Sequence, residues 1–251
     1  MEKRILLLVV FLMAAGLWSS SALALAPMGP PKASLEQGQF SAGVDYSFSE
    51  IDVEVSGYGI TFVGDDVESN MVFANLGYGI APNVEAFLRL GVADAESEGF
   101  SGDTEFAYGF GIKGTFAQEG DLVWGGLFQM SWMTSEDTGT LVAYGHTFTG
   151  TQEIDAYEIQ IAVGPTYEME GLSVYGGPFL HFVGGNYDVS GSVAGPIVNE
   201  SGSLSFDVEQ ESEFGGYIGA QFDINENTSC NIEYQLTGDA SAIGAGIVWR
   251  F

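Results

Sequence analysis

Apolar residues alternate with small or polar residues along most of the chain after residue 40. A period of two is that of a β-strand, whose side chains point alternately to opposite faces. The clearest case is residues 241–251, SAIGAGIVWRF, which predict a strand with one apolar face and one small or charged face. The apolar positions are Ile243, Ala245, Ile247, Trp249 and Phe251, and those between are Gly244, Gly246, Val248 and Arg250.

Ten segments alternate in this way, and the connections between the first nine alternate between long and short. Transmembrane barrels of Gram-negative bacteria combine an even strand number with short periplasmic turns and longer extracellular loops. We therefore predict an all-β fold, a transmembrane antiparallel up-and-down β-barrel of ten strands. Eight strands would require the loss of one hairpin, and twelve would require new strands in the first or last long loop. The segments are residues 40–48, 71–80, 84–92, 106–116, 122–132, 157–167, 172–182, 214–224, 230–236 and 241–251.

The apolar face of these strands is expected to meet lipid, because the opposite face offers many Gly, Gln, Asn and charged residues. Aromatic residues gather near the strand ends, as in the girdles of membrane barrels. The alternative is a soluble β-sandwich or lipocalin-like barrel, which would bury its apolar face instead. Between residues 49 and 69 the alternation changes phase, so this stretch is predicted to lie outside the bilayer as a hairpin extension. Residues 134–153 and 184–211 are predicted to be long polar loops, the second with room for its own hairpin around residues 199–202.

The amino terminus has the pattern of a signal peptide, with Lys3 and Arg4 before an apolar run and then small residues. Cleavage is predicted after Ala24 or Ala26, and the first is favoured because the second would leave Pro27 at the new terminus. A retained membrane helix is the alternative, but the apolar run falls short of the roughly 18 residues of a span. The predicted domains are residues 1–24 as signal peptide, 25–39 as a periplasmic tail, and 40–251 as the barrel.

The chain is strongly acidic, with 34 Asp and Glu against 6 Lys and Arg and a net charge of −28. This balance excludes nucleic acid as a partner and argues against electrostatic docking on anionic lipid. Nine charged residues fall on the polar register and are predicted to face the lumen, either as a polar core that locks the barrel or as the lining of a pore. They are Asp45, Glu85, Arg89, Lys113, Asp121, Glu158, Asp223, Glu233 and Arg250.

The aromatic end of the chain, Trp249 and Phe251, resembles the closing strand of Gram-negative outer-membrane β-barrels, where it acts as an assembly signal. The whole predicted barrel resembles the small outer-membrane β-barrel family that includes opacity-type adhesins. That resemblance implies a barrel in the outer membrane, with lipid and the barrel-assembly machinery as partners and extracellular loops that bind a ligand. The loops of this chain are acidic, however, which departs from the adhesin pattern.

Catalytic residues are not predicted, nor is a cofactor or a metal site. Ten strands also describe the omptin proteases, which need two acidic pairs and a His, but the only His residues, His146 and His181, have no Asp within two residues. The His-x-Ser arrangement of outer-membrane lipid A deacylases is absent as well. The lone Cys230 is predicted to face lipid. The expected function is therefore a non-enzymatic barrel that anchors acidic extracellular loops for surface interaction or envelope integrity. A narrow, weakly cation-selective channel is the first alternative, and an omptin-like or lipid-modifying enzyme the second.

Overall fold

The computed structural model describes residues 25–58, 60–97, 100–143, 146–195, 199–209 and 214–251. The expected signal peptide lies outside these residues. No helix among them is long and apolar enough to cross a membrane. The strands are β1 (Phe40–Gly57), β2 (Ile60–Ala81), β3 (Val84–Ala93), β4 (Glu96–Ser97), β5 (Phe100–Ser101), β6 (Glu105–Glu119), β7 (Leu122–Ala143), β8 (His146–Met169), β9 (Leu172–Ala194), β10 (Asn199–Glu209), β11 (Phe214–Asn225), β12 (Thr228–Leu236) and β13 (Ala240–Arg250).

Antiparallel pairing links the long strands into a closed ring. In the described residues the ring runs β1, β2, β3, β6, β7, β8, β9, β11, β12 and β13, and β13 pairs back to β1. The closing ladder runs from Ser41 opposite Arg250 to Ile51 opposite Ala240. The terminal strand thus closes the barrel, and the all-β antiparallel barrel predicted from the sequence is confirmed.

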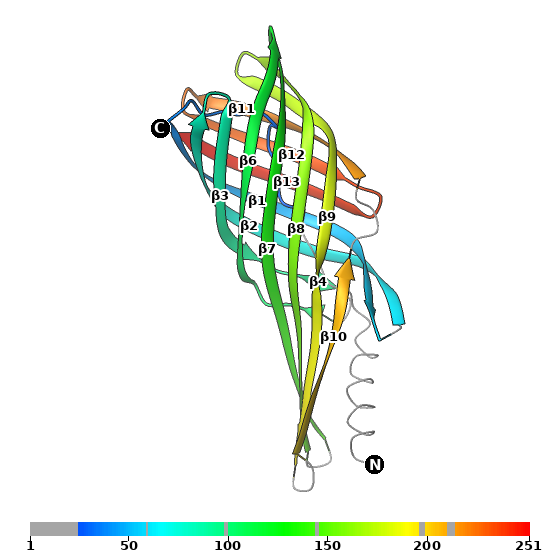
Figure 1. Cartoon of the computed structure of the whole chain (residues 1–251). Helices are drawn as coiled ribbons and strands as arrows, with labels where there is room; N and C mark the ends of the chain where they lie inside the picture. Colours follow the sequence, from blue (N-terminus) through cyan, green and yellow to red (C-terminus); the bar gives the residue numbers. More distant parts are fainter. Residues whose placement is uncertain (1–24, 59, 98–99, 144–145, 196–198, 210–213) are drawn as a thin grey trace.

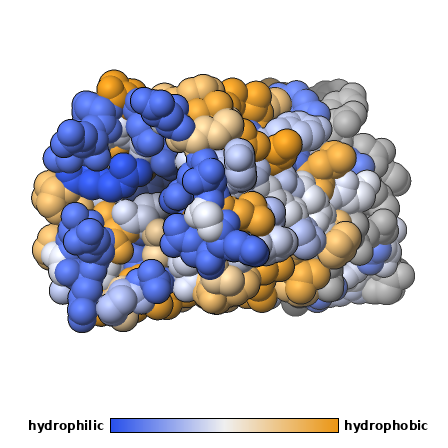
Figure 2. Space-filling model, turned by 90° about the horizontal axis from the view of Figure 1, so that it is seen from above, coloured by the Kyte–Doolittle hydropathy of each residue, from blue (hydrophilic) through white to orange (hydrophobic). Residues whose placement is uncertain are grey.

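Side-chain exposure follows the predicted register across the ring. Leu76, Leu88 and Ile218 are each more than half exposed, as expected of side chains on the face predicted to meet lipid. On the inner face Tyr175 and Phe179 are almost completely buried. Figure 2 views the end that carries the short turns and shows hydrophilic residues gathered over it and hydrophobic residues along the flanks. The outer surface is therefore the apolar one.

The strands β7, β8 and β9 have 22, 24 and 23 residues, whereas a membrane-spanning strand needs only about 9 to 11. Their extra length projects from one end of the barrel together with β10, which pairs with β9 and with Glu54–Ser56 of β1 (Figure 1). We call this projection the β extension; its described residues are 134–143, 146–155, 184–194 and 199–209. Short turns are expected at the periplasmic end of such barrels, and with that predicted orientation the β extension is expected outside the cell.

The segments predicted as long loops, 134–153 and 184–211, are thus largely paired strand, and the prediction of loops was wrong. The second segment does contain a hairpin, in which β9 and β10 pair from Ala194 opposite Asn199. The ladder between β7 and β8 is continuous out to Ala143 opposite His146. This ladder contains several Thr residues, and Thr is β-branched and favours strands. Thr138 and Thr151 place their hydroxyl oxygens 3.0 Å apart across the ladder. Since water bathes much of both faces, no apolar period marks these strands in the sequence.

The side chains that face the interior change from polar to apolar where the strands extend beyond the ring. In β1 the inward side chains run from Asp45 and Ser49 to Ile51 and Val55 without an exchange of faces. The change of phase in the sequence therefore records a new environment: beyond the membrane the inner face is apolar and the outer face polar. We call the buried residues of this region the outer core; they are Ile51, Val55, Val67, Phe73, Ile154, Val189, Phe206 and Val208.

This architecture leads to a first prediction, for the purified protein in detergent. Its circular dichroism should be almost entirely that of β-strand, because the described residues outside the strands are the irregular segment 25–39, turns and short connections, none of them helical. Its electrophoretic mobility should also change on boiling, since a closed ladder resists unfolding until heated. A helical spectrum in detergent would contradict the ring.

Candidate functional site

The inside of the barrel is filled by the chain's own residues 25–35, which we call the lumen segment. Leu25, Ala26 and Met28 are at most 2% exposed, and the segment contacts side chains of strands all around the ring. The expected periplasmic tail is therefore inside the barrel. The physical reason is that its backbone supplies hydrogen-bonding groups that the acidic lumen lacks.

Three inward carboxylates accept backbone N–H groups of the lumen segment, Glu233 and Glu85 from two residues each and Glu158 from one residue through both of its oxygens. Glu158 accepts from Ala26 at 3.2 and 3.3 Å. Glu233 accepts from Met28 and Gly29, both at 2.9 Å. At the periplasmic end Glu85 accepts from Ser34 at 2.6 Å and Leu35 at 3.0 Å. The inward acids outnumber the three predicted lumen cations, Arg89, Lys113 and Arg250. Backbone N–H groups of the lumen segment supply the additional donors.

The carbonyl groups of the segment are bound as closely as its amides. Gln235 donates to the carbonyl oxygen of Ala26 at 3.0 Å, and Gln129 donates to the same oxygen at 3.3 Å. Arg89 donates to the carbonyl oxygen of Pro27 at 2.7 Å. Recognition therefore rests mainly on backbone groups. The prolines at positions 27, 30 and 31 bring no N–H group that would need a partner in this confined space.

Inward glycines make room for the lumen segment. A Cβ atom at Gly244 would lie 2.7 Å from Cγ of Pro27, and one at Gly125 would lie 2.2 Å from the carbonyl oxygen of Pro31. No side chain fits at such a distance. These glycines therefore admit a second length of chain rather than leaving an open channel.

Arg89 is the central cation of the lumen. Its guanidinium lies 2.8 Å from Asp45 Oδ2, donates to Asn75 at 3.0 Å, and stacks over the ring of Phe73 at 5.2 Å. With its bond to Pro27 it joins the lumen segment to three strands. Both partners of the Arg89–Asp45 pair are nearly buried, at 5% and 11% side-chain exposure.

Seven of the nine predicted lumen charges face the interior, although Glu85, Lys113 and Arg250 are only partly buried. Lys113 lies over the ring of Phe87 at 5.7 Å, and Arg250 donates to Ser229 at 2.8 Å. Asp121 and Asp223 are exposed, because Asp121 sits in the β6–β7 turn and Asp223 near the periplasmic end of β11. For these two the predicted lumen position was wrong.

Glu158 also lies beside His181, a pairing that sequence separation hid. His181 Nε2 is 3.2 Å from Glu158 Oε1, and Ser131 donates to Glu158 Oε2 at 3.2 Å. The described residues provide neither ring nitrogen of His181 with a hydrogen bond. Ser131 bonds to the carboxylate and not to the imidazole, so the group lacks the order of a nucleophile, base and orienting acid.

The second polar feature is the acidic outer face of the β extension. Burial raises the pKa of Glu153, and the nearby carboxylates of Asp155, Glu136 and Asp188 raise it further. Like charges therefore crowd on this face. Among the described residues no three or more His, Cys, Asp or Glu side chains are placed to hold a metal ion.

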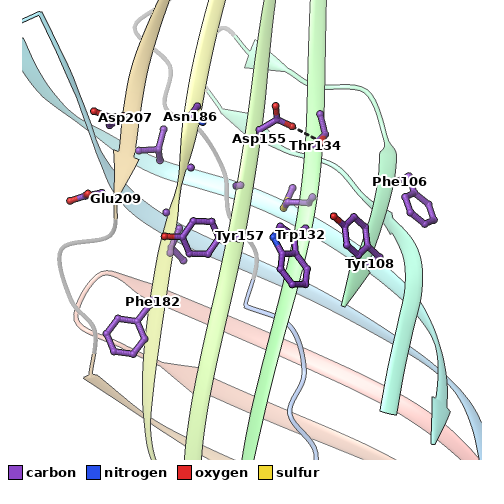
Figure 3. A pocket seen from close by; sticks show the side chains of 16 residues that line it. Phe106, Tyr108, Trp132, Thr134, Asp155, Tyr157, Phe182, Asn186, Asp207 and Glu209 are labelled. Carbon is purple, nitrogen blue, oxygen red and sulfur yellow. Dashed lines mark hydrogen bonds between the residues drawn. The ribbon is translucent and has the colours of Figure 1, made fainter. Parts of the chain in front are cut away.

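A hollow of about 690 Å³ lies on the outer surface where the ring meets the β extension (Figure 3). Tyr108, Trp132 and Tyr157 line its membrane side, and the rings of Tyr108 and Trp132 stack with centroids 5.2 Å apart. Asp155 and Asp207 line it on the side of the β extension. The hollow thus marks the boundary between the aromatic girdle and the acidic extracellular face.

Residues 82–251 match the family described as the outer membrane protein beta-barrel domain. This chain belongs to that family. The predicted family and the predicted location in the Gram-negative outer membrane are thereby confirmed. In this family member Trp249 lies near the end of the closing strand and Phe251 directly follows it, both with exposed side chains. Phe251 exchanges two backbone hydrogen bonds of 3.0 Å with Phe40.

Solved structures similar to this family member include other outer-membrane barrels. The outer membrane protease OmpT from Escherichia coli is 10% identical, with 90% of this chain and 99% of that chain covered and a TM-score of 0.44. The translocator domain of the autotransporter NalP from Neisseria meningitidis is 13% identical, with 100% and 95% covered and a TM-score of 0.46. The attachment invasion locus protein Ail of Yersinia pestis is 16% identical, with 86% and 99% covered and a TM-score of 0.29. A search of curated proteins found no matching relative.

Proposed function

We propose that this protein is a non-enzymatic outer-membrane barrel that holds an acidic β extension outside the cell for interaction with cationic surfaces. The observation that carries the proposal is the β extension itself, whose paired strands continue well past the membrane and present crowded carboxylates such as Glu136, Glu153 and Asp188. A paired ladder fixes these groups in place. A rigid acidic face attracts cationic partners, with a strength that falls as salt is added.

The filled lumen supports an anchoring role over the alternative of a narrow cation-selective channel. The lumen segment occupies the polar part of the interior, and the outer core fills the part beyond it. The burial of Glu158 and His181 likewise supports a structural role over an enzymatic one, because a substrate has no path to a group that is 0–4% exposed.

The test is to shorten the β extension by removing the same number of residues from both strands of each paired hairpin. Removing residues 136–153 and 188–205, which include Glu136, Glu153 and Asp188, and closing each hairpin with Asn-Gly keeps the β7–β8 and β9–β10 ladders in register. We expect the shortened barrel to insert and keep its heat-dependent mobility shift, but to lose binding of a fluorescent oligolysine at low salt.

A matched variant of full length replaces Glu136, Glu153, Asp155 and Asp188 by their amides. It should lose oligolysine binding as well, because the carboxylate charge and not the length of the strands is the proposed basis of binding. Undiminished binding by the amide variant would refute the proposal, and failure of the shortened barrel to insert would assign the β extension a structural role.

A further inference from the structure

The two cleavage positions that the sequence leaves open have different consequences inside the lumen. Cleavage after Ala26 would remove the N–H group that Glu158 binds and the carbonyl group that Gln235 and Gln129 bind. It would also place a new ammonium group on Pro27, whose carbonyl oxygen already accepts from Arg89 at 2.7 Å. The new ammonium group and the Arg89 guanidinium would then both lie at Pro27, while the buried Glu158 would lose its backbone donor.

Cleavage after Ala24 preserves every one of these contacts. The new ammonium group would be on Leu25, and its nitrogen is separated from the Ala26 nitrogen by only three covalent bonds, which limits the two atoms to less than about 4 Å. The Ala26 nitrogen in turn lies 3.2 and 3.3 Å from the two oxygens of Glu158. The Leu25 side chain is buried and belongs to the same apolar cluster as the outer core, so this residue also has a packing role.

Glu158 is the lumen acid that needs a cation most. It is 4% exposed, and no Lys or Arg side chain among the described residues forms an ion pair with it. Asp45 has Arg89, and Glu233 and Glu85 lie near Lys113. A buried carboxylate without a nearby positive charge is costly. The fully buried His181 lies beside Glu158, and its ring nitrogens have no hydrogen-bond partner in the described residues. Glu158 and His181 together therefore have room for a further hydrogen-bond donor.

We propose that Glu158, with Ser131 and His181, is a binding site for the α-ammonium group of the processed chain, which begins at Leu25. The site recognises a primary ammonium group at the start of an extended peptide: Glu158 binds the charge, and Gln235 and Arg89 bind the following two carbonyl groups. Signal cleavage after Ala24 thus supplies the lumen with a further cation, placed beside Glu158.

The first test is the intact mass of the barrel extracted from the outer membrane. We expect the mass of a chain that starts at Leu25. A chain that starts at Pro27 would overturn the proposal, and this result would leave the proposed role of the β extension untouched.

The second test measures reaction of the α-amine with N-hydroxysuccinimidyl acetate at pH 7, in chains released at Leu25 by a tag-cleaving protease and refolded in detergent. In the folded barrel we expect acetylation to be at least about tenfold slower than in urea, equivalent to about 1.4 kcal/mol of protection. Glu158→Gln should restore much of the reactivity, whereas the matched Glu85→Gln change, at the other end of the lumen segment, should leave the amine protected. Equal reaction rates in the folded and unfolded chains would overturn the proposal, as would equal protection in the Glu158→Gln barrel and the unsubstituted barrel.

Discussion

Replacing Arg89 by methionine is expected to lower the free energy of unfolding by about 3–5 kcal/mol, the usual effect of removing one partner from a buried ion pair. Methionine leaves Asp45 as a charge with little solvent around it and removes the donor to Pro27. It also removes the cation stacked on Phe73. The midpoint of urea unfolding, followed by the mobility shift and by tryptophan fluorescence in detergent, measures the loss.

Arg250→Met is the matched control, because Arg250 is a half-buried lumen cation with one hydrogen bond, to Ser229 at 2.8 Å. Its loss should cost only about 0.5–1.5 kcal/mol, the typical value of one hydrogen bond. Adding Asp45→Asn to Arg89→Met should recover part of the stability by removing the unpaired charge. Equal losses in the two single variants would show that Arg89 is not the centre of the lumen network.

The sequence predicted the membrane-spanning part of the fold well because lipid imposes one rule on every strand. A lipid-facing Arg or Lys costs about 2–4 kcal/mol near the midplane, and a carboxylate less, so Arg89 and Glu158 could both be assigned inward from the alternation. The rule fails at strand ends, where water reaches both faces. Asp121 and Asp223 lie there, and their register carried no information about burial.

The contents of the lumen could not be predicted from the same pattern. The lumen segment has no periodicity, and its contacts join residues far apart in the chain, such as Ala26 with Glu158 and Met28 with Glu233. Most of them use backbone groups, which every residue carries. The one usable signal was the excess of inward acids over inward cations, which showed that other donors were needed without showing where they come from.

Deleting residues 25–35 is expected to let water into the periplasmic half of the lumen without opening a channel through the membrane. The deletion removes the donors to Glu85, Glu158 and Glu233, and those carboxylates will draw in water instead. The outer core is made by residues of the strands themselves, including Phe73, and stays in place. Water should therefore enter the lumen from the periplasmic side and be stopped by the outer core.

A cysteine at position 131 can report whether water enters the lumen, in a chain whose native Cys230 is replaced by serine. Ser131 is 4% exposed beside Glu158, so Ser131→Cys should react slowly with a charged thiol reagent in the full-length barrel. If opening of the filled lumen costs about 3 kcal/mol, the deletion should accelerate labelling by about a hundredfold. Single-channel recordings of both proteins should show no large, steady current, because the outer core still blocks the path of ions. A steady current through the deleted barrel would show that the lumen segment alone closes it, and one through the full-length barrel would contradict the filled lumen itself.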